Sequence, residues 1–203
     1  MSSLIYFINY RKRYGYKFTE MFSELVAVEP DAPLDPVPYC FSTMLEFLDL
    51  AIRILDTNTK EFENLSVEFA NAFGPLKCDE RTFLDDFVNL GLAMKTVYKE
   101  GRQKMYSGVD LSPEFSVRIV DCQDKSGHIK TAIEPLSLKD AIWFDFLLNG
   151  TNGYRQCEYL LRFSEKRKGC VPWISISRAS TKWCSDACRM SAARRAHKEK
   201  LRG

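Results

Sequence analysis

The chain has 203 residues, of which 45% are hydrophobic and 13% aromatic, and its formal net charge is +2. This composition can supply a substantial core, so it excludes a globally disordered protein. The longest apolar runs fall far short of the ~20 residues of a membrane span, and the charges of Arg11–Arg13 follow the first apolar stretch instead of preceding it, unlike a secretory signal. We therefore expect a cytoplasmic protein with no membrane partner.

The charge is distributed unevenly along the chain. From Arg162 to the end there are 12 Lys or Arg and 3 Asp or Glu, which leaves 17 basic and 24 acidic residues before it. A basic segment on an acidic body favours a polyanion as the partner of that segment. The alternative is self-neutralisation, in which the basic segment folds back on the acidic body.

The first residues, 1–9, are apolar and aromatic and are typical of a strand. The segment 29–38 holds four prolines, and it predicts a rigid extended connector because proline fits neither a helix interior nor a central strand. Apolar residues at helical spacing then predict three helices, over about 41–56, 61–73 and 80–100.

After these helices the periodicity changes. Alternating residues on both sides of a turn-rich segment predict a β hairpin near 115–133. Ser137 suits the N-cap of a further helix, which should end at the two Asn-Gly pairs within 149–153. We place a domain boundary at this turn, between a mostly helical body, 1–150, and a small module, 154–203, whose last helix spans about 185–201.

Four of the seven cysteines lie in the last third of the chain, as Cys157, Cys170, Cys184 and Cys188. Cys184 and Cys188 are four residues apart at the expected start of a helix, so both sulfurs can reach one ion. A common zinc module adds a Cys-x-x-Cys knuckle, but Leu160 stands at its second position and leucine cannot bind a metal. A four-cysteine zinc site then requires Cys170 in its place.

Other residues compete less well for the metal. His197 lies nine residues beyond Cys188, more than two helical turns away. Cys40, Cys78 and Cys122 are expected to be ordinary buried or half-buried thiols. The alternative to a zinc site is a metal-free module held together by its apolar residues.

The basic residues of the module are the expected nucleic-acid contacts. One cluster precedes Gly169 on a loop, and the others lie mainly along one side of the last helix, where small alanines would allow close approach to phosphates. The candidate residues are Lys166, Arg167, Lys168, Arg189, Arg194, Arg195, Lys198 and Arg202. No Asn or Gln accompanies them on the helix, so we expect contacts to phosphates more than to bases.

Residues 137–200 resemble the C-terminal region of the bacterial CGNR zinc-finger (ABATE-type) proteins. The matching stretches are Ser137–Phe144, Tyr154–Cys157 and Trp183–Arg189, and Phe69–Leu76 resembles a segment that these proteins often carry earlier. The resemblance implies a helical N-terminal body and a C-terminal treble-clef-like zinc finger, in cytoplasmic proteins presumed to regulate transcription by binding DNA. The residues Cys188-Arg-Met-Ser191 stand in place of the Cys-Gly-Asn-Arg signature.

The expected fold is thus mainly α with a small β hairpin, followed by a treble-clef-like module. The expected function is nucleic-acid binding, with DNA favoured, and not catalysis, since the two histidines, His128 and His197, lack catalytic partners and no phosphate-loop or hydrolase motif is present. The alternative is a non-catalytic interaction subunit of a nucleic-acid-handling or phage-defence complex, in which the finger is a scaffold for a protein partner.

Overall fold

The structure is a computed structural model that describes the backbone of residues 5, 7–21, 23–53, 58–77, 81–100, 116–123, 129–151, 153–163, 170, 173–175 and 182–200. The chain divides into two compact units, Met1–Gly150, here called the body, and Thr151–Gly203, here called the C-terminal unit. Among the described residues, no helix combines the length and the hydrophobicity that a membrane crossing requires.

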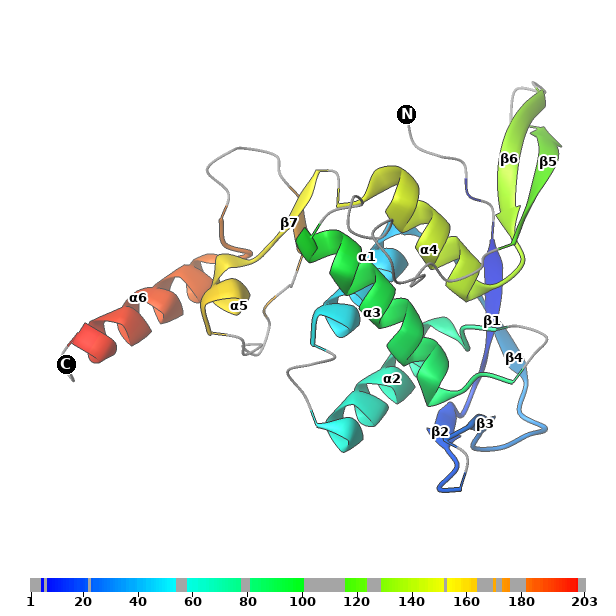
Figure 1. The fold of residues 1–203 in the computed structure, drawn as a ribbon, viewed down its shortest axis with the longest axis horizontal. Coiled ribbons are helices and arrows are strands. Elements are labelled where there is room, and N and C mark those ends of the chain that lie inside the picture. The colour runs from blue at the N-terminus through cyan, green and yellow to red at the C-terminus, as the bar shows by residue number, and fades with distance from the viewer. Residues whose placement is uncertain are drawn as a thin grey trace. The chain divides into compact units, whose positions relative to one another are not determined.

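The body combines helices with small antiparallel strand pairs (Figure 1). In chain order its elements are β1 Ile8–Lys12, β2 Tyr16–Phe18, β3 Leu25–Ala27, β4 Leu34–Pro38, α1 Phe41–Arg53, α2 Thr59–Phe73, α3 Leu84–Glu100, β5 Val117–Gln123, β6 Ile129–Pro135 and α4 Leu138–Asn149. Strand β1 pairs with β4, β2 with β3, and β5 with β6. Over the described residues, the predicted helices and the predicted hairpin are confirmed, and α3 begins at Leu84, a few residues later than predicted.

Capping residues explain where two of these helices begin. Asn58 precedes α2, and its side-chain oxygen accepts a hydrogen bond from the Glu61 N–H at 2.9 Å. Ser137 precedes α4, and its Oγ accepts from the Asp140 N–H at 3.1 Å. Both side chains satisfy a donor that the first helical turn would leave open. The prediction of Ser137 as a cap is confirmed.

The proline-rich segment includes an edge strand. Its second half is β4, which pairs with β1 so that Ile8 faces Pro38 and Tyr10 faces Pro36. In a two-stranded sheet each strand is an edge, and proline is tolerated there because its missing N–H leaves no ladder bond unmade. The predicted extended conformation is confirmed for 34–38, and the pairing of this segment with β1 is a feature that the sequence did not predict.

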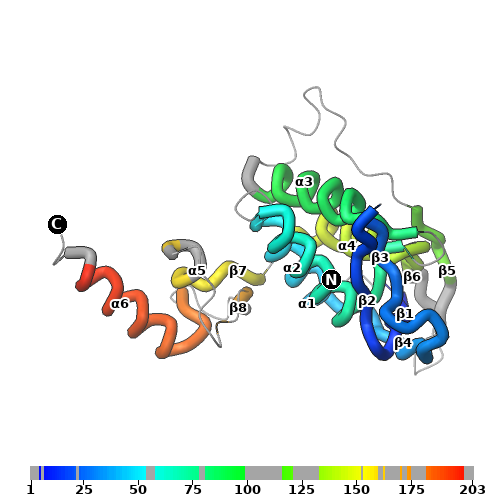
Figure 2. Tube along the Cα trace, turned by 90° about the horizontal axis from the view of Figure 1, so that it is seen from below, coloured from blue at the N-terminus to red at the C-terminus, as the bar shows by residue number. Residues whose placement is uncertain are grey.

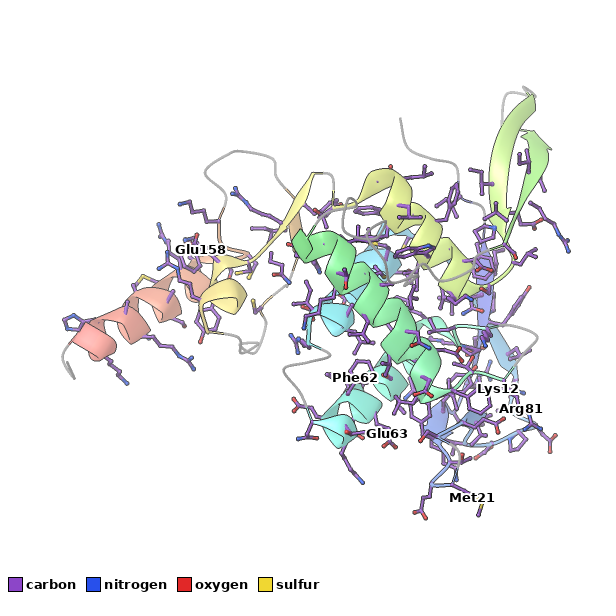
Figure 3. All side chains as sticks on the ribbon, viewed as in Figure 1. Lys12, Met21, Phe62, Glu63, Arg81 and Glu158 are labelled. Atoms are coloured by element: carbon purple, nitrogen blue, oxygen red, sulfur yellow. The ribbon has the colours of Figure 1, made fainter. Side chains whose placement is uncertain are left out.

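The hairpin of β2 and β3 was not predicted at all. Each of its strands has three residues, too few for an alternating pattern to stand out. The register joins Tyr16 to Ala27 and Phe18 to Leu25. Figure 3 shows Met21 at the turn of this hairpin with its side chain pointing outward, and that residue is 82% exposed.

The core of the body is an aromatic cluster between three helices, α1, α2 and α3, which Figure 2 shows close together. The ring of Phe87 on α3 lies 6.2 Å from that of Phe47 on α1 and 6.3 Å from that of Phe69 on α2. Phe18 on β2 contacts the same ring edge-on at 6.2 Å. Trp143 on α4 is fully buried as well. The apolar faces that the sequence predicts are therefore buried together.

We expect Gly74→Ala to destabilise the body by at least about 2 kcal/mol, because it adds strain and a steric clash. Gly74 ends α2 with φ of 89°, and an added Cβ would lie 2.5 Å from Asn9 Nδ2 and 2.6 Å from the Tyr10 carbonyl oxygen. The same Asn9 amide donates to the carbonyls of Phe73 at 2.8 Å and Pro75 at 3.1 Å, so the clash disturbs a buried bond pair.

Urea unfolding of the whole protein measures this effect. Gly150→Ala is the matched control, because Gly150 also lies in the body with a positive φ, of 54°, but the nearest atom to the added Cβ is the Phe146 carbonyl oxygen at 4.0 Å. Equal destabilisation in the two variants would contradict the role given to the contact with Asn9.

Candidate metal centre

The C-terminal unit contains a second small strand pair and two helices. Its elements are β7 Tyr154–Gln156, α5 Glu158–Phe163, β8 Trp173–Ser175 and α6 Asp186–Lys200. Strands β7 and β8 are antiparallel, with Gln156 facing Trp173 and Tyr154 facing Ser175. The short helix α5 follows β7 directly, and α6 ends the described part of the unit.

The strand pairing brings two cysteines from distant positions to one place. Cys157 directly follows β7, and Cys170 lies three residues before β8. Because Gln156 faces Trp173, both cysteines come from the same end of this ladder. The other two cysteines lie at the start of α6, with Cys184 just before the helix and Cys188 in its first turn.

The four sulfur atoms form one cluster. All of them lie within 4.8 Å of one another, and Cys184 Sγ lies 3.3 Å from Cys188 Sγ and 3.7 Å from Cys170 Sγ. A tetrahedral metal ion with bonds of about 2.3 Å to sulfur separates its sulfur ligands by about 3.8 Å. The cluster therefore has the size of a four-sulfur metal site, and the four cysteines could hold a metal ion. In such a site Cys170 would supply the ligand that Leu160 cannot.

Burial disfavours the thiolate form of these cysteines unless a cation is present. Cys157 and Cys188 are fully buried and Cys170 is 5% exposed. Burial raises the pKa of the Cys170 thiol, and the sulfurs of Cys188, Cys184 and Cys157 raise it further. Thiolates crowded together in a dry site repel one another, and a bound cation would offset that repulsion.

Backbone bonds hold the second pair of cysteines in place. The Cys184 N–H donates to Cys157 Sγ at 3.4 Å, which links the two halves of the cluster. The Cys188 N–H donates to Ser185 Oγ at 3.3 Å, so Ser185 caps the first turn of α6. Such bonds orient sulfur ligands before a metal binds to them.

A small apolar cluster surrounds the sulfurs. Tyr159 of α5 and Ala192 of α6 are buried with three of the cysteines, and Trp183 packs against them. The Arg195 guanidinium carbon lies 5.6 Å from the centre of the Tyr159 ring, so a cation–π contact joins α6 to α5. Among the described residues, few apolar side chains share this cluster, and the sulfurs themselves form much of it.

Two further predictions about cysteine and histidine can be compared with the structure. His197 is exposed on α6 and is not part of the sulfur cluster. Cys40 was expected to be at least half-buried, but it is exposed. Partial burial raises the pKa of the Cys40 thiol, but hydrogen bonds with Ser42 and Thr43 outweigh it and the pKa falls below its ordinary value. His128, Cys78 and the side chain of Cys122 lie outside the described residues.

The candidate nucleic-acid contacts on α6 have different surroundings. Arg189, Arg194 and Lys198 are exposed, and Arg189 forms an ion pair with Asp186 at 3.0 Å. Arg195 is half-buried by its contact with Tyr159, so it serves packing as well as charge. The remaining candidates, Lys166, Arg167, Lys168 and Arg202, lie outside the described residues.

Sequence reasoning also missed Tyr159 and Arg162 on α5. The Arg162 guanidinium carbon lies 5.4 Å from the centre of the Trp183 ring, and Arg162 pairs with Glu158 one turn earlier. The spacing of Glu158 and Arg162 is a signal of helical pairing, but α5 has only six residues and no apolar period of its own.

Comparison of the chain with protein-family models, with curated proteins and with solved structures finds no match. The resemblance to CGNR proteins stays a prediction. What the fold and the site define is a helical body and a small unit with a four-cysteine candidate metal centre.

Proposed function

We propose that this protein binds nucleic acid, with DNA as the favoured partner, through a zinc-holding C-terminal unit that contacts mainly phosphates. The observation that carries the proposal is that the sulfur cluster lies at the start of the exposed basic helix α6. A metal held there fixes the first turn of the helix that carries the charge. The body would serve for sensing or assembly, and no catalytic role is proposed.

Zinc is the metal that the ligand chemistry favours. Four thiolates in a tetrahedral arrangement are typical of structural zinc sites, whereas catalytic zinc sites keep one position open for water. Here all four positions would be filled by Cys157, Cys170, Cys184 and Cys188, so the metal would stabilise the fold and supply no chemistry of its own. A unit of this size has little apolar core, and metal binding then contributes directly to its folding.

The order of strands and helices in the C-terminal unit supports a treble-clef-like arrangement. In the C-terminal unit a strand pair comes first, and a helix follows whose start provides two ligands. The departure is that the first two ligands are separated by α5 instead of lying in one tight knuckle. We propose a treble-clef-like module in which Cys157 and Cys170 together replace that knuckle.

Charge and shape of α6 support phosphate contacts. The buried side of the helix carries Cys188 and Ala192, one turn apart. The exposed side carries Arg189, Arg194 and Lys198, together with the small Ala193. Exposed cations on a slim helix suit the phosphate rows beside a groove, where most protein–DNA hydrogen bonds are made.

We expect the double variant Arg194→Ala/Lys198→Ala to weaken binding to a generic DNA duplex and to flatten its salt dependence. Each phosphate that is no longer neutralised should reduce the slope of log K against log salt concentration by about 0.9. Fluorescence anisotropy of a labelled duplex over a series of salt concentrations measures both quantities.

The matched control is Lys60→Ala/Arg81→Ala, which removes the same charge from exposed positions of the body. It should leave the slope unchanged. The proposal fails if both double variants behave alike, or if the unmodified protein shows no salt-dependent binding. A protein partner bound equally by all variants would instead favour the interaction-subunit alternative.

A further inference from the structure

A second site lies beside the metal centre, in a pocket that neither the sulfur cluster nor the exposed side of α6 includes. The pocket has a volume of about 290 Å³ and is lined by Arg155, Gln156, Glu158, Arg162 and Lys182. All five residues belong to the C-terminal unit, and Glu158 is labelled in Figure 3, where it lies at the start of α5.

The residues that line the pocket carry a net positive charge. Three of its residues carry a positive charge and only Glu158 carries a negative one. The Glu158 carboxylate accepts hydrogen bonds from Nε of Arg162 at 3.0 Å and from Nη2 of the same guanidinium. These bonds use only some of the donors of Arg162 and hold the guanidinium in position, 5.4 Å over the Trp183 ring. A cation would be repelled from such a pocket, and an anion would be attracted.

A neutral residue, Gln156, also lines the pocket and is only 5% exposed. Arginine, lysine and amide groups around one small cavity are the donor set that recognises phosphate oxygens. The volume is at the lower limit of ligand pockets, about 300 Å³, which suits one phosphate group with the sugar that carries it.

The residues that line the pocket are close in sequence to two of the candidate metal ligands, Cys157 and Cys184. Glu158 follows Cys157, and Lys182 comes two residues before Cys184. The Glu158 N–H donates to the Lys182 carbonyl oxygen at 2.9 Å, and the Cys184 N–H donates to Cys157 Sγ at 3.4 Å. A metal that joins Cys157 to Cys184 would therefore fix the pocket as well.

We infer that this pocket binds a single phosphate group of a nucleotide unit, and that the bound metal keeps the pocket in shape. The inference rests on the proposed function, because the nucleic acid supplies the phosphate. The phosphate can be an internal phosphodiester or the terminal phosphate of a strand, which share the same oxygens. The pocket adds Arg155, Arg162 and Lys182 to the contacts made by α6.

Inorganic phosphate is the first probe, titrated at constant ionic strength against the metal-loaded full chain and followed by two-dimensional NMR. We expect saturable shifts of the amide signals around Lys182 to Cys184. The double variant Arg155→Ala/Lys182→Ala should weaken this binding at least about tenfold, since it removes two charge-assisted bonds. The control Lys60→Ala/Arg81→Ala should bind phosphate as the unmodified protein does.

Two further measurements show whether a loss of phosphate binding comes from the pocket or from a damaged metal site. The metal content of each variant shows whether the site is intact, and Lys182→Ala alone is a milder variant, because the hydrogen bond at that position uses only the backbone carbonyl. Shifts that do not saturate, or that are equal in the pocket variants with intact metal, would overturn the inference. Duplex binding retained in such an experiment would leave the proposed function standing.

Short DNA strands with and without a 5′-phosphate identify the source. Tighter binding of the phosphorylated strand, with the difference abolished in Arg155→Ala/Lys182→Ala, assigns the pocket to a strand end. Equal binding of both strands, weakened in the same variant, assigns it to an internal phosphodiester. If the variant and the unmodified protein bind both strands with the same affinity, the inference is overturned. If the protein binds phosphate in the pocket but does not bind DNA, the proposed function fails and the phosphate-binding pocket stands.

Discussion

Cys184→Ser is expected to abolish metal binding and to unfold the C-terminal unit. The unmodified protein should carry roughly one metal ion per chain, because four thiolates fill one tetrahedral site. A serine hydroxyl stays protonated and cannot replace a thiolate, and structural zinc sites contribute about 10–16 kcal/mol of apparent binding free energy at neutral pH. Elemental analysis of protein purified without added metal measures the metal content, and NMR shows the unfolding.

Cys40→Ser is the matched control for this variant. Cys40 is exposed and lies in the body, where its sulfur contacts Ser42 Oγ at 2.8 Å, outside the sulfur cluster. The same chemical change there should leave the metal content at roughly one ion per chain. A metal content that survives Cys184→Ser, or falls equally in both variants, would contradict the assignment of the site.

Phe87→Ala should be the most damaging single change in the body. Phe87 is fully buried, and its ring contacts those of Phe18, Phe47 and Phe69. Truncation of a buried phenylalanine leaves a cavity and costs about 3–5 kcal/mol. For a unit of this size such a destabilisation lowers the melting temperature by roughly 6–20 °C. Urea and thermal unfolding of the full chain measure the two quantities.

Tyr14→Ala provides the comparison for Phe87→Ala. Tyr14 is 57% exposed, so removal of its ring should change the free energy of unfolding by less than about 0.5 kcal/mol. If Phe87→Ala were as mild as Tyr14→Ala, the aromatic cluster would not be the centre of the core.

The helices of the body could be predicted because each repeats its apolar residues at helical spacing over three or more turns. The cap at Ser137 marked the start of one of them. The pairing of β1 with β4 could not be predicted from local patterns. Its register joins Tyr10 to Pro36 across the intervening β2–β3 hairpin, and prolines in a sequence argue against a strand unless the strand is known to be an edge.

The candidate metal centre was predictable only in part. The spacing of Cys184 and Cys188 at a helix start identifies one half of the site from sequence alone. For the other half, Cys170 was named only because Leu160 cannot bind a metal, whereas in the structure the pairing of Gln156 with Trp173 brings Cys170 next to Cys157. Three-residue strands give no sequence signal strong enough to predict such a pairing.

The exposure of the basic residues on α6 also could not be predicted from the sequence. Helical spacing places charges around α6, but it does not say which side another element covers. Tyr159 of α5 covers the side that carries Arg195, and that residue is therefore half-buried while Arg194 and Lys198 remain exposed. The cationic pocket escaped prediction for a related reason, since Arg155, Arg162 and Lys182 meet only when the sulfur cluster brings their segments together.

The ligands of the bound metal test the central proposal most directly. X-ray absorption at the zinc edge of the purified full chain measures the number and kind of atoms around the ion. The proposed centre predicts zinc with four sulfur ligands at about 2.3 Å. Nitrogen or oxygen in the first coordination sphere, or a folded C-terminal unit that binds no zinc, would contradict it.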